Sequence, residues 1–157
     1  AGLMISPQGE LKVLEYNCRF GDPETQPIMM RLQSDLVDLC NTAVDHQLNE
    51  VQAAWDPRPA VGIVMAAGGY PGAYANGAPI SGLDDVDRES VKVFHAGTSE
   101  QDGQIVTSGG RVLCVVALGN SVTQAQQLAY NNVAKISWNE VYYRTDIGYR
   151  AIERERK

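Results

Sequence analysis

Residues 14–26 read LEYNCRFGDPETQ, and this stretch decides how the rest of the chain is interpreted. Its first half has the alternation of a β-strand, in which every second side chain lies on one face. If the strand stays extended, Glu15, Asn17 and Arg19 share a face, with successive members about 7 Å apart along the backbone. Asp22, followed by proline, has the character of a helix N-cap. We therefore expect a strand that carries a polar cluster, followed by a helix.

A carboxylate and an amide on one strand face can bind a hard divalent cation. Mg²⁺ suits such a site because it is often held by few protein ligands and completed by phosphate oxygens and water. An arginine farther along the same face would lie against phosphate groups as a planar, charged donor. The same alternation is also typical of any half-exposed antiparallel strand. Spacing alone therefore leaves a metal site and a solvated strand face as alternatives.

The patterns on either side of this stretch predict a hairpin and a helix. Upstream, apolar runs at residues 3–6 and 11–18 surround a Pro-Gln-Gly-Glu turn, which predicts a β-hairpin. Downstream, apolar residues recur at helical spacing over residues 27–46, which predicts one amphipathic helix that reaches about His46. Prolines at positions 57 and 59 exclude regular structure, so we place a domain boundary at this point.

Beyond the prolines the sequence is rich in strand-like runs. We expect strands over residues 61–66, 91–95, 104–107, 111–118 and 141–143. One helix is expected from Ser121 or Thr123 to about Ile136, since either hydroxyl can cap it. The elements predict an α+β fold with two parts, residues 1–50 and a small β-rich domain over residues 51–157.

The string NCRFGDPETQ resembles the metal-binding strand and following loop of ATP-grasp ligases, and in detail the signature of the glycinamide ribonucleotide synthetase family. Further family motifs follow in the same order: MAAGGYPG, VFHAGT, SGGRVLCVVALG and DIGYRAIERE. The resemblance covers essentially the whole chain. It implies that residues 1–50 complete an ATP-grasp lobe and that residues 51–157 form the C-terminal domain.

The resemblance implies a reaction that joins glycine to 5-phosphoribosylamine at the expense of ATP. Glycine would become glycyl phosphate, and attack by the amine would give glycinamide ribonucleotide, ADP and phosphate. Glu15 and Asn17 match the family's ligands for Mg²⁺ or Mn²⁺. Arg19 would neutralise the transferring phosphoryl group, and Asp22 would contact the substrate amine.

Two residues of the second part are candidates for substrate binding. Arg111 follows Ser-Gly-Gly, where exposed backbone N–H groups and a guanidinium can form an anion site. By resemblance, Arg111 would hold the ribose 5-phosphate and His95 would line the same pocket. From the residues alone, a tight turn before a surface arginine is an equally open interpretation of Arg111. A lone histidine at a strand end is more often structural.

Composition limits the other partners. The net charge of −6 and the pI of about 4.8 argue against nucleic acid as a ligand. No apolar run is long enough to span a membrane. The three cysteines have wide spacings and no CxxC, which favours a reducing cytoplasm. Cys40 and Cys114 lie in apolar patterns and are expected in the core.

The start of the chain predicts a fragment. It opens without an initiator methionine, directly on a strand-like run, and we recognise no glycine-rich loop to cover ATP phosphates. We therefore expect the C-terminal piece of a longer enzyme, with the upstream part as its partner and no activity in this chain alone. The alternatives are another ATP-grasp carboxylate–amine ligase and a non-catalytic β-rich binding module.

Overall fold

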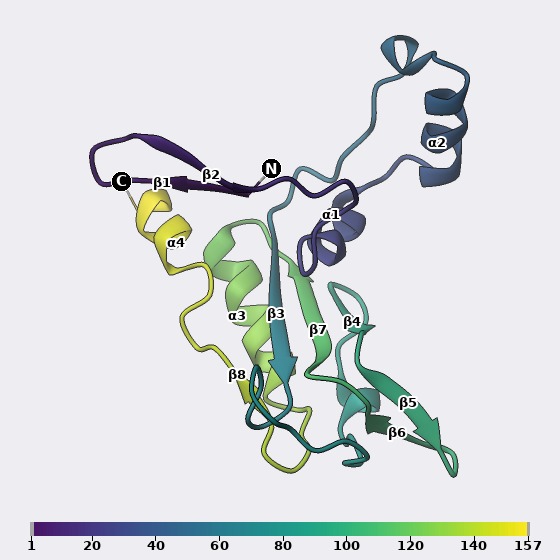
Figure 1. The fold of residues 1–157 in the computed structure, drawn as a ribbon, viewed down its shortest axis with the longest axis vertical. Coiled ribbons are helices and arrows are strands. Elements are labelled where there is room, and N and C mark those ends of the chain that lie inside the picture. Colours follow the sequence, from purple (N-terminus) through teal and green to yellow (C-terminus); the bar gives the residue numbers. More distant parts are fainter. Residues whose placement is uncertain (1, 157) are drawn as a thin grey trace.

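The structure of the chain, a computed structural model, describes residues 2–156 and has an α+β fold, as predicted (Figure 1). The strands are β1 (Gly2–Ile5), β2 (Leu11–Glu15), β3 (Ala60–Ala66), β4 (Val91–His95), β5 (Thr98–Gln101), β6 (Gln104–Thr107), β7 (Arg111–Leu118) and β8 (Tyr142–Tyr143). The α-helices are α1 (Thr25–Arg31), α2 (Leu36–Val44), α3 (Val122–Val133) and α4 (Tyr149–Glu155). Two short 3-10 helices, η1 (Leu48–Glu50) and η2 (Leu83–Asp85), complete the list.

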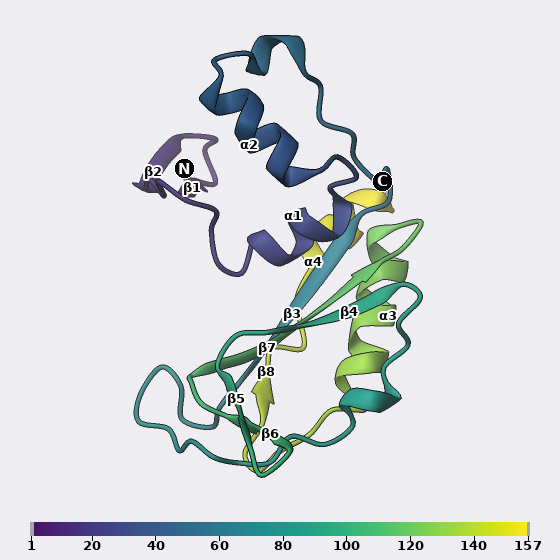
Figure 2. The same ribbon diagram turned by 90° about the vertical axis from the view of Figure 1, so that its right-hand side faces the viewer.

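A four-stranded antiparallel sheet in the order β4-β7-β3-β8 organises the C-terminal part. Strand β7 is central and buried from residue 112 to residue 118, which explains its almost continuous apolar sequence. Figure 2 shows α3 running along one face of this sheet. On β3, the side chains of Ile63 and Met65 are fully buried in the core that the sheet forms with α3. The small residues Ala125 and Ala129 of α3 belong to the same core and let the helix approach the sheet closely.

The other face of β3 is more open. Because side chains alternate along β3, Gly62 and Val64 lie on the sheet face opposite Ile63 and Met65. Helix α1 contacts β3 and β7, and Gly62 has no room for a large side chain because Pro27 of α1 lies against it. The face opposite α3 is therefore only partly covered, which leaves space beside α1 for a site.

Most predicted elements of the C-terminal part are confirmed. The bounds of β4, β6 and β7 are those predicted, and β3 and β8 differ by one residue. Ser121 caps α3, since its side chain accepts a hydrogen bond of 3.1 Å from Gln124 N. Two elements are additional: β5, which pairs with β6, and α4 near the C-terminus. The division into residues 1–50 and 51–157 stays a prediction.

The single helix predicted over residues 27–46 is wrong, because the chain is extended between α1 and α2. Leu32 has φ −70° and ψ 120° and forms an antiparallel bridge with Trp55. Helix α2 begins afresh after Asp35, whose carboxylate accepts hydrogen bonds from Val37 N and Asp38 N. The sequence suggested one helix because the apolar residues of α1 and α2 together keep a helical spacing across the break. Cys40 on α2 is exposed, against expectation, whereas Cys114 is buried as predicted.

Asp22 is not the N-cap of α1. The N-cap position belongs to Glu24, and α1 starts at Thr25, whose N–H donates to Gly21 O at 2.9 Å. Pro27 lies in the first turn, where its missing N–H is not needed for an intrahelical hydrogen bond. The carboxylate of Asp22 is therefore free to interact outside the helix.

Strands β1 and β2 form the predicted hairpin, which extends away from the main sheet (Figure 1). Strand β2 ends at Glu15 rather than at residue 18. Large apolar side chains of the hairpin are exposed: Leu3, Met4, Ile5, Leu11, Val13 and Leu14. This part of the chain contributes no buried residue to the core among residues 2–156.

Residues 35–53 form an arm whose two ends are held together by a neck. Gln33 N donates to Ala54 O at 2.9 Å, and Ala54 N donates to the hydroxyl of Ser34 at 2.8 Å. The arm carries α2 and η1 and projects from the molecule at the hairpin end (Figures 1 and 2). Within residues 2–156, no helix combines the length and apolar character that crossing a bilayer requires.

The neck also contains a charged cluster that predicts acid sensitivity. The Arg58 side chain donates to both carboxylate oxygens of Asp56, and Arg31 donates to Asp56 O at 3.1 and 3.0 Å. Hydrogen bonds from the side chain and backbone of Arg58 lower the pKa of Asp56 to about 2. The folded-state pKa thus lies below the unfolded one. The stabilisation is present above pH about 4 and is lost as the pH falls to about 2.

We therefore expect Asp56→Asn to flatten the pH dependence of stability in this acid range. Urea unfolding between pH 5 and pH 2 measures the effect, and Asp84→Asn is the control because Asp84 pairs with Arg88 at a fully exposed position. Asp146 and Glu155 also have lowered pKa values, so only part of the acid dependence should disappear. An Asp56→Asn curve parallel to wild type would contradict this assignment.

Candidate functional site

Two predicted site residues from distant parts of the sequence meet in the structure. Arg111, at the start of β7, donates from Nη2 to Oδ2 of Asp22 at 2.8 Å and from Nη1 to Asp22 O at 3.0 Å. The two residues are 89 positions apart. Asp22 also accepts a hydrogen bond of 3.2 Å from Nε2 of Gln26 on Oδ1. The loop before α1 is thereby fixed to the start of the central strand β7.

The glycines before Arg111 are required by close packing. A Cβ on Gly109 would lie 3.0 Å from Gly97 Cα, and one on Gly97 would lie 2.7 Å from Gly109 Cα. A Cβ on Gly110 would lie 2.2 Å from a ring carbon of Tyr70. The Ser-Gly-Gly turn thus lets two backbones and an aromatic ring approach each other beside Arg111, which a side chain would prevent.

A cavity of about 240 Å³ lies beside this contact, on the sheet face opposite α3. It is lined by Pro23, Gly62, Val64, Ala66, Tyr70, Arg111, Tyr142, Arg144 and Ile147. Arg111 and Arg144 are its only charged lining residues in the part of the chain that the structure describes. The cavity therefore combines apolar walls with two arginines, which favours an anionic ligand with a nonpolar or sugar portion.

Arg144, Tyr142 and Tyr70 were not predicted as site residues. Tyr142 pairs with Ala66 at the sheet edge, and Arg144 follows β8 directly. Arg144 donates to both carboxylate oxygens of Asp146, at 2.9 and 2.8 Å, and these hydrogen bonds lower the pKa of Asp146. The motif DIGYRAIERE, which begins at Asp146, was the signal that could have drawn attention to this segment.

Glu15 and Asn17 lie next to each other, as the strand pattern predicted. Nδ2 of Asn17 donates to Oε1 of Glu15 at 3.1 Å, although β2 has ended at Glu15. Glu15 is exposed and Asn17 is half-buried. Their carboxylate and amide oxygens form a donor set that fits Mg²⁺ or Mn²⁺, provided that water and phosphate oxygens complete the shell. Among residues 2–156 no group of three or more His, Cys, Asp or Glu is arranged for metal binding.

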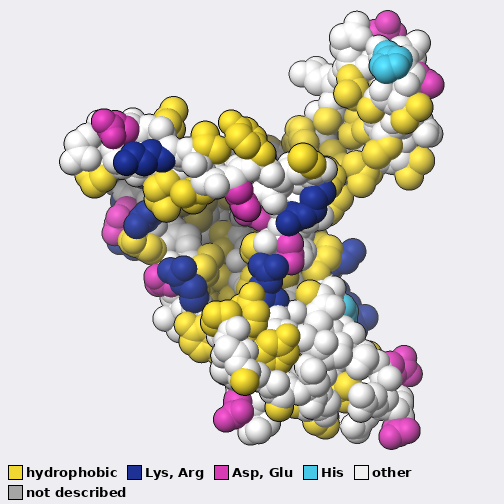
Figure 3. All heavy atoms as spheres, in the orientation of Figure 1, with side chains coloured by type: hydrophobic (Ala, Val, Ile, Leu, Met, Phe, Trp, Pro, Cys, Tyr) yellow, Lys and Arg dark blue, Asp and Glu magenta, His cyan; other side chains and the backbone are white. Residues whose placement is uncertain are grey.

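Arg19 lies in the bend that follows β2, so it does not continue the strand face. Its Nη1 donates to Phe20 O at 2.7 Å. The remaining N–H groups of the guanidinium are available to a ligand. In the space-filling view, Lys or Arg and Asp or Glu side chains gather around the hollow between the hairpin and the sheet domain (Figure 3).

His95 does not line the cavity of Arg111, contrary to expectation. It is exposed at the end of β4, where Nδ1 lies 3.1 Å from the Thr98 hydroxyl, and it lines a second cavity with Met30 and Lys92. Strand β4 lies at the sheet edge away from β8, whose residues border the Arg111 cavity. A role for His95 in substrate binding stays a prediction.

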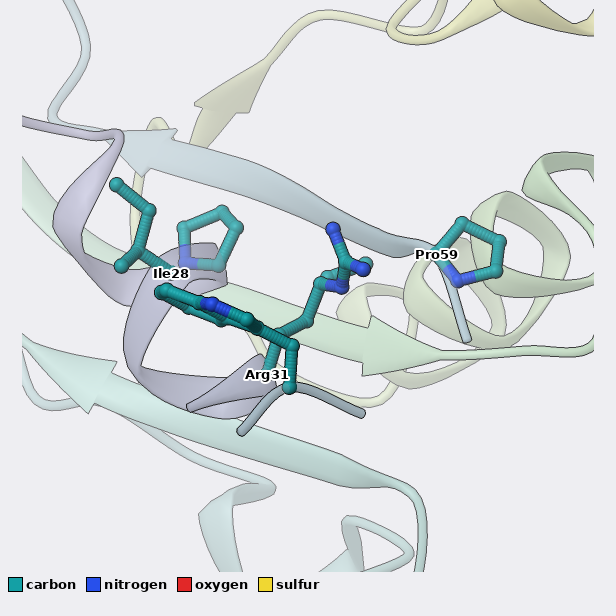
Figure 4. Close-up of a pocket in the computed structure, with 6 residues that line it drawn as sticks. Ile28, Arg31 and Pro59 are labelled. Carbon is teal, nitrogen blue, oxygen red and sulfur yellow. The ribbon is translucent and has the colours of Figure 1, made fainter. Parts of the chain in front are cut away.

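Another cavity, of about 580 Å³, lies between α1 and the start of β3 and contains none of the predicted residues. Arg31 extends between Ile28 and Pro59 within it (Figure 4). The guanidinium already donates to Asp56 O, and the other lining side chains are apolar. We therefore assign the chemistry to the smaller cavity, which contains two arginines, one of them the predicted residue Arg111.

Comparison with known proteins first identifies the class. The fold matches a crystal structure of phosphoribosylamine–glycine ligase from Thermotoga maritima, with a TM-score of 0.70 and 35% sequence identity over 92% of this chain and 35% of that chain. The fold is thus that of part of a carbon–nitrogen ligase. The chain belongs to the phosphoribosylglycinamide synthetase family, whose C-domain model matches residues 60–150.

Relatives of the same family match the whole chain. The phosphoribosylamine–glycine ligase of Vibrio parahaemolyticus is 64% identical over 157 residues, and that of Pseudomonas aeruginosa is 62% identical over 156 residues. These matches cover 100% and 99% of this chain but only 37% and 36% of the relatives. The chain thus spans little more than a third of the length of the curated relatives it matches, and the resemblance seen in the sequence is confirmed.

Proposed function

We propose that this chain is the C-terminal part of an ATP-dependent ligase that joins glycine to 5-phosphoribosylamine in purine biosynthesis. Glycine would be activated by ATP as glycyl phosphate, and attack by the amine would give glycinamide ribonucleotide, ADP and phosphate. The family and the relatives' names support the ligase class. The proposal of this particular reaction is supported by the arrangement of the site residues.

The contact between Asp22 and Arg111 carries the proposal. The family resemblance assigns Asp22 to the amine and Arg111 to the phosphate of one substrate. These residues, 89 positions apart, lie in contact beside one cavity. Each carboxylate oxygen of Asp22 keeps lone-pair capacity beyond its present partner. Asp22 can therefore accept a hydrogen bond from the amine while Arg111 donates to the phosphate.

The hairpin end would act on ATP. Glu15 and Asn17 would hold Mg²⁺ or Mn²⁺, which supplies positive charge against the phosphate oxygens when it is bound. Arg19 would donate its free N–H groups to the phosphoryl group that is transferred, where charge develops. Burial raises the pKa of the Cys114 thiol to about 12, which disfavours the thiolate that a nucleophile requires.

The test is ADP release by the full-length ligase that contains this chain. With MgATP, glycine and freshly made phosphoribosylamine, we expect release that stops when either glycine or phosphoribosylamine is omitted. The chain over residues 1–157 alone should release no ADP, because the segments that cover ATP would be missing. Release that continues without glycine would indicate another ATP-grasp ligase. A folded full-length protein with no ATP turnover would indicate a binding module.

A further inference from the structure

The cavity of Arg111 contains a second arginine that the family signature does not explain. Arg144 lines the same cavity but comes from the segment after β8. We infer that Arg111 and Arg144 together form a two-arginine clamp for the phosphate of the phosphoribosylamine, an inference that rests on the proposed function. Arg144 would thereby be a substrate-positioning residue of this site.

Both guanidinium groups keep donors for a ligand. A guanidinium has five N–H groups. Arg144 commits Nε and one N–H of Nη2 to Asp146, and Arg111 commits one N–H of each Nη to Asp22. Three N–H groups are left on each arginine. Two guanidinium groups can together donate hydrogen bonds to several oxygens of one phosphate, as bidentate arginine–phosphate pairs do.

The charges around the cavity favour an anion. Asp22 and Asp146 are not among the lining residues, whereas Arg111 and Arg144 are. An anion would therefore meet the arginines first, and the carboxylates would orient them. The apolar walls of Val64 and Ile147 strengthen such an interaction because they lower the local dielectric.

The remaining lining suits a phosphorylated sugar. Tyr70 and Tyr142 are also lining residues of the cavity. Phenol hydroxyls can bind the hydroxyls of a sugar. The volume of about 240 Å³ is below the range of roughly 300–1,000 Å³ typical of pockets for larger ligands. It therefore suits a phosphopentose better than a whole nucleotide.

The segment that carries Arg144 is fixed before any ligand binds. The hydroxyl of Tyr130, on α3, donates to Arg144 O at 2.7 Å and accepts from Ile147 N at 3.1 Å. Desolvation raises the pKa of this hydroxyl, so it stays protonated and keeps donating. With the Asp146 ion pair, this anchor holds the guanidinium in one place and lowers the entropy cost of binding.

The test compares Arg144→Gln, Arg144→Lys and the control Arg88→Gln in the full-length ligase. Arg88 pairs with Asp84 at an exposed position outside this cavity. For Arg144→Gln we expect the Kd of ribose 5-phosphate and the KM for phosphoribosylamine to rise roughly 10- to 100-fold. The KM values for ATP and glycine, the Kd of ribose and the melting temperature should not change. Arg144→Lys should recover part of the affinity, and Arg88→Gln should behave as wild type.

Two outcomes would overturn the clamp: an unchanged Kd for ribose 5-phosphate in Arg144→Gln, or an equal weakening for ribose and ribose 5-phosphate. Either result in an enzyme that still requires phosphoribosylamine for ADP release would leave the proposed function intact. ADP release without that requirement would instead refute the proposed function, while calorimetric titration with ribose 5-phosphate would still report on the clamp.

Discussion

Replacement of Glu15 by alanine in the full-length ligase is expected to lower kcat/KM for ADP release by roughly 10²- to 10⁴-fold, because cation-borne charge stabilisation of phosphoryl transfer amounts to several kcal/mol. Glu15 supplies the only carboxylate of the Glu15–Asn17 pair. Asn17 alone would hold the cation weakly, since a neutral amide offers no charge. A titration of ADP release against Mg²⁺ should therefore shift to higher concentration.

The control for this experiment lies on the same hairpin. Glu10 is also exposed and follows the turn after β1, and only its backbone is engaged, with Ser6. Glu10→Ala should keep wild-type kcat/KM and the same Mg²⁺ dependence. Equal losses in Glu10→Ala and Glu15→Ala would show that the hairpin acts as a whole, and an active Glu15→Ala enzyme would place the cation elsewhere.

The largest effect on stability is expected for Ile63→Ala in β3. Ile63 is 0% exposed in the core between the sheet and α3, so truncation removes buried methyl groups and leaves a cavity. Such changes cost about 2–5 kcal/mol. Ile5→Ala is the matched control, because the same side chain on β1 is 65% exposed and should change the free energy of unfolding by less than ~0.5 kcal/mol.

Urea unfolding of residues 1–157, followed by circular dichroism, measures both changes. A large loss in Ile5→Ala would show that the hairpin packs in solution. A loss in Ile63→Ala no larger than in Ile5→Ala would contradict the assignment of the core to the face covered by α3. The comparison is sensitive because both variants remove the same atoms.

The elements that the sequence predicted well are those whose local pattern coincides with their burial. Strand β7 is apolar after Arg111 because residues 112–118 are buried, and α3 carries a serine cap at its first turn. Helix α4 was missed because Ile152 is its only buried residue, so that it has almost no apolar face. Strand β5 was missed although Asp102-Gly103, both at positive φ, is a typical hairpin turn.

For the candidate site, the sequence predicted local contacts but not contacts between distant segments. The adjacency of Glu15 and Asn17 was predictable because it is a local property of residues two positions apart, although β2 itself ends at Glu15. The contact of Asp22 with Arg111 is set by how α1 packs on the sheet, and nothing in either local sequence records it. His95 and Arg111 lie two rungs apart in the β4–β7 register but open to different cavities, which a residue pattern cannot show.

The neck between residues 32–34 and 54–56 has a consequence for how the family can change. The chain leaves the sheet domain and returns to it at hydrogen-bonded positions, so the arm of residues 35–53 is attached at a single point. Insertions or deletions between these positions change the length of the arm at the surface. They do not change the spacing of α1 and β3. The arm is thus a place where homologous genes can differ in length without disturbing the cavity, and where a reporter peptide can be inserted.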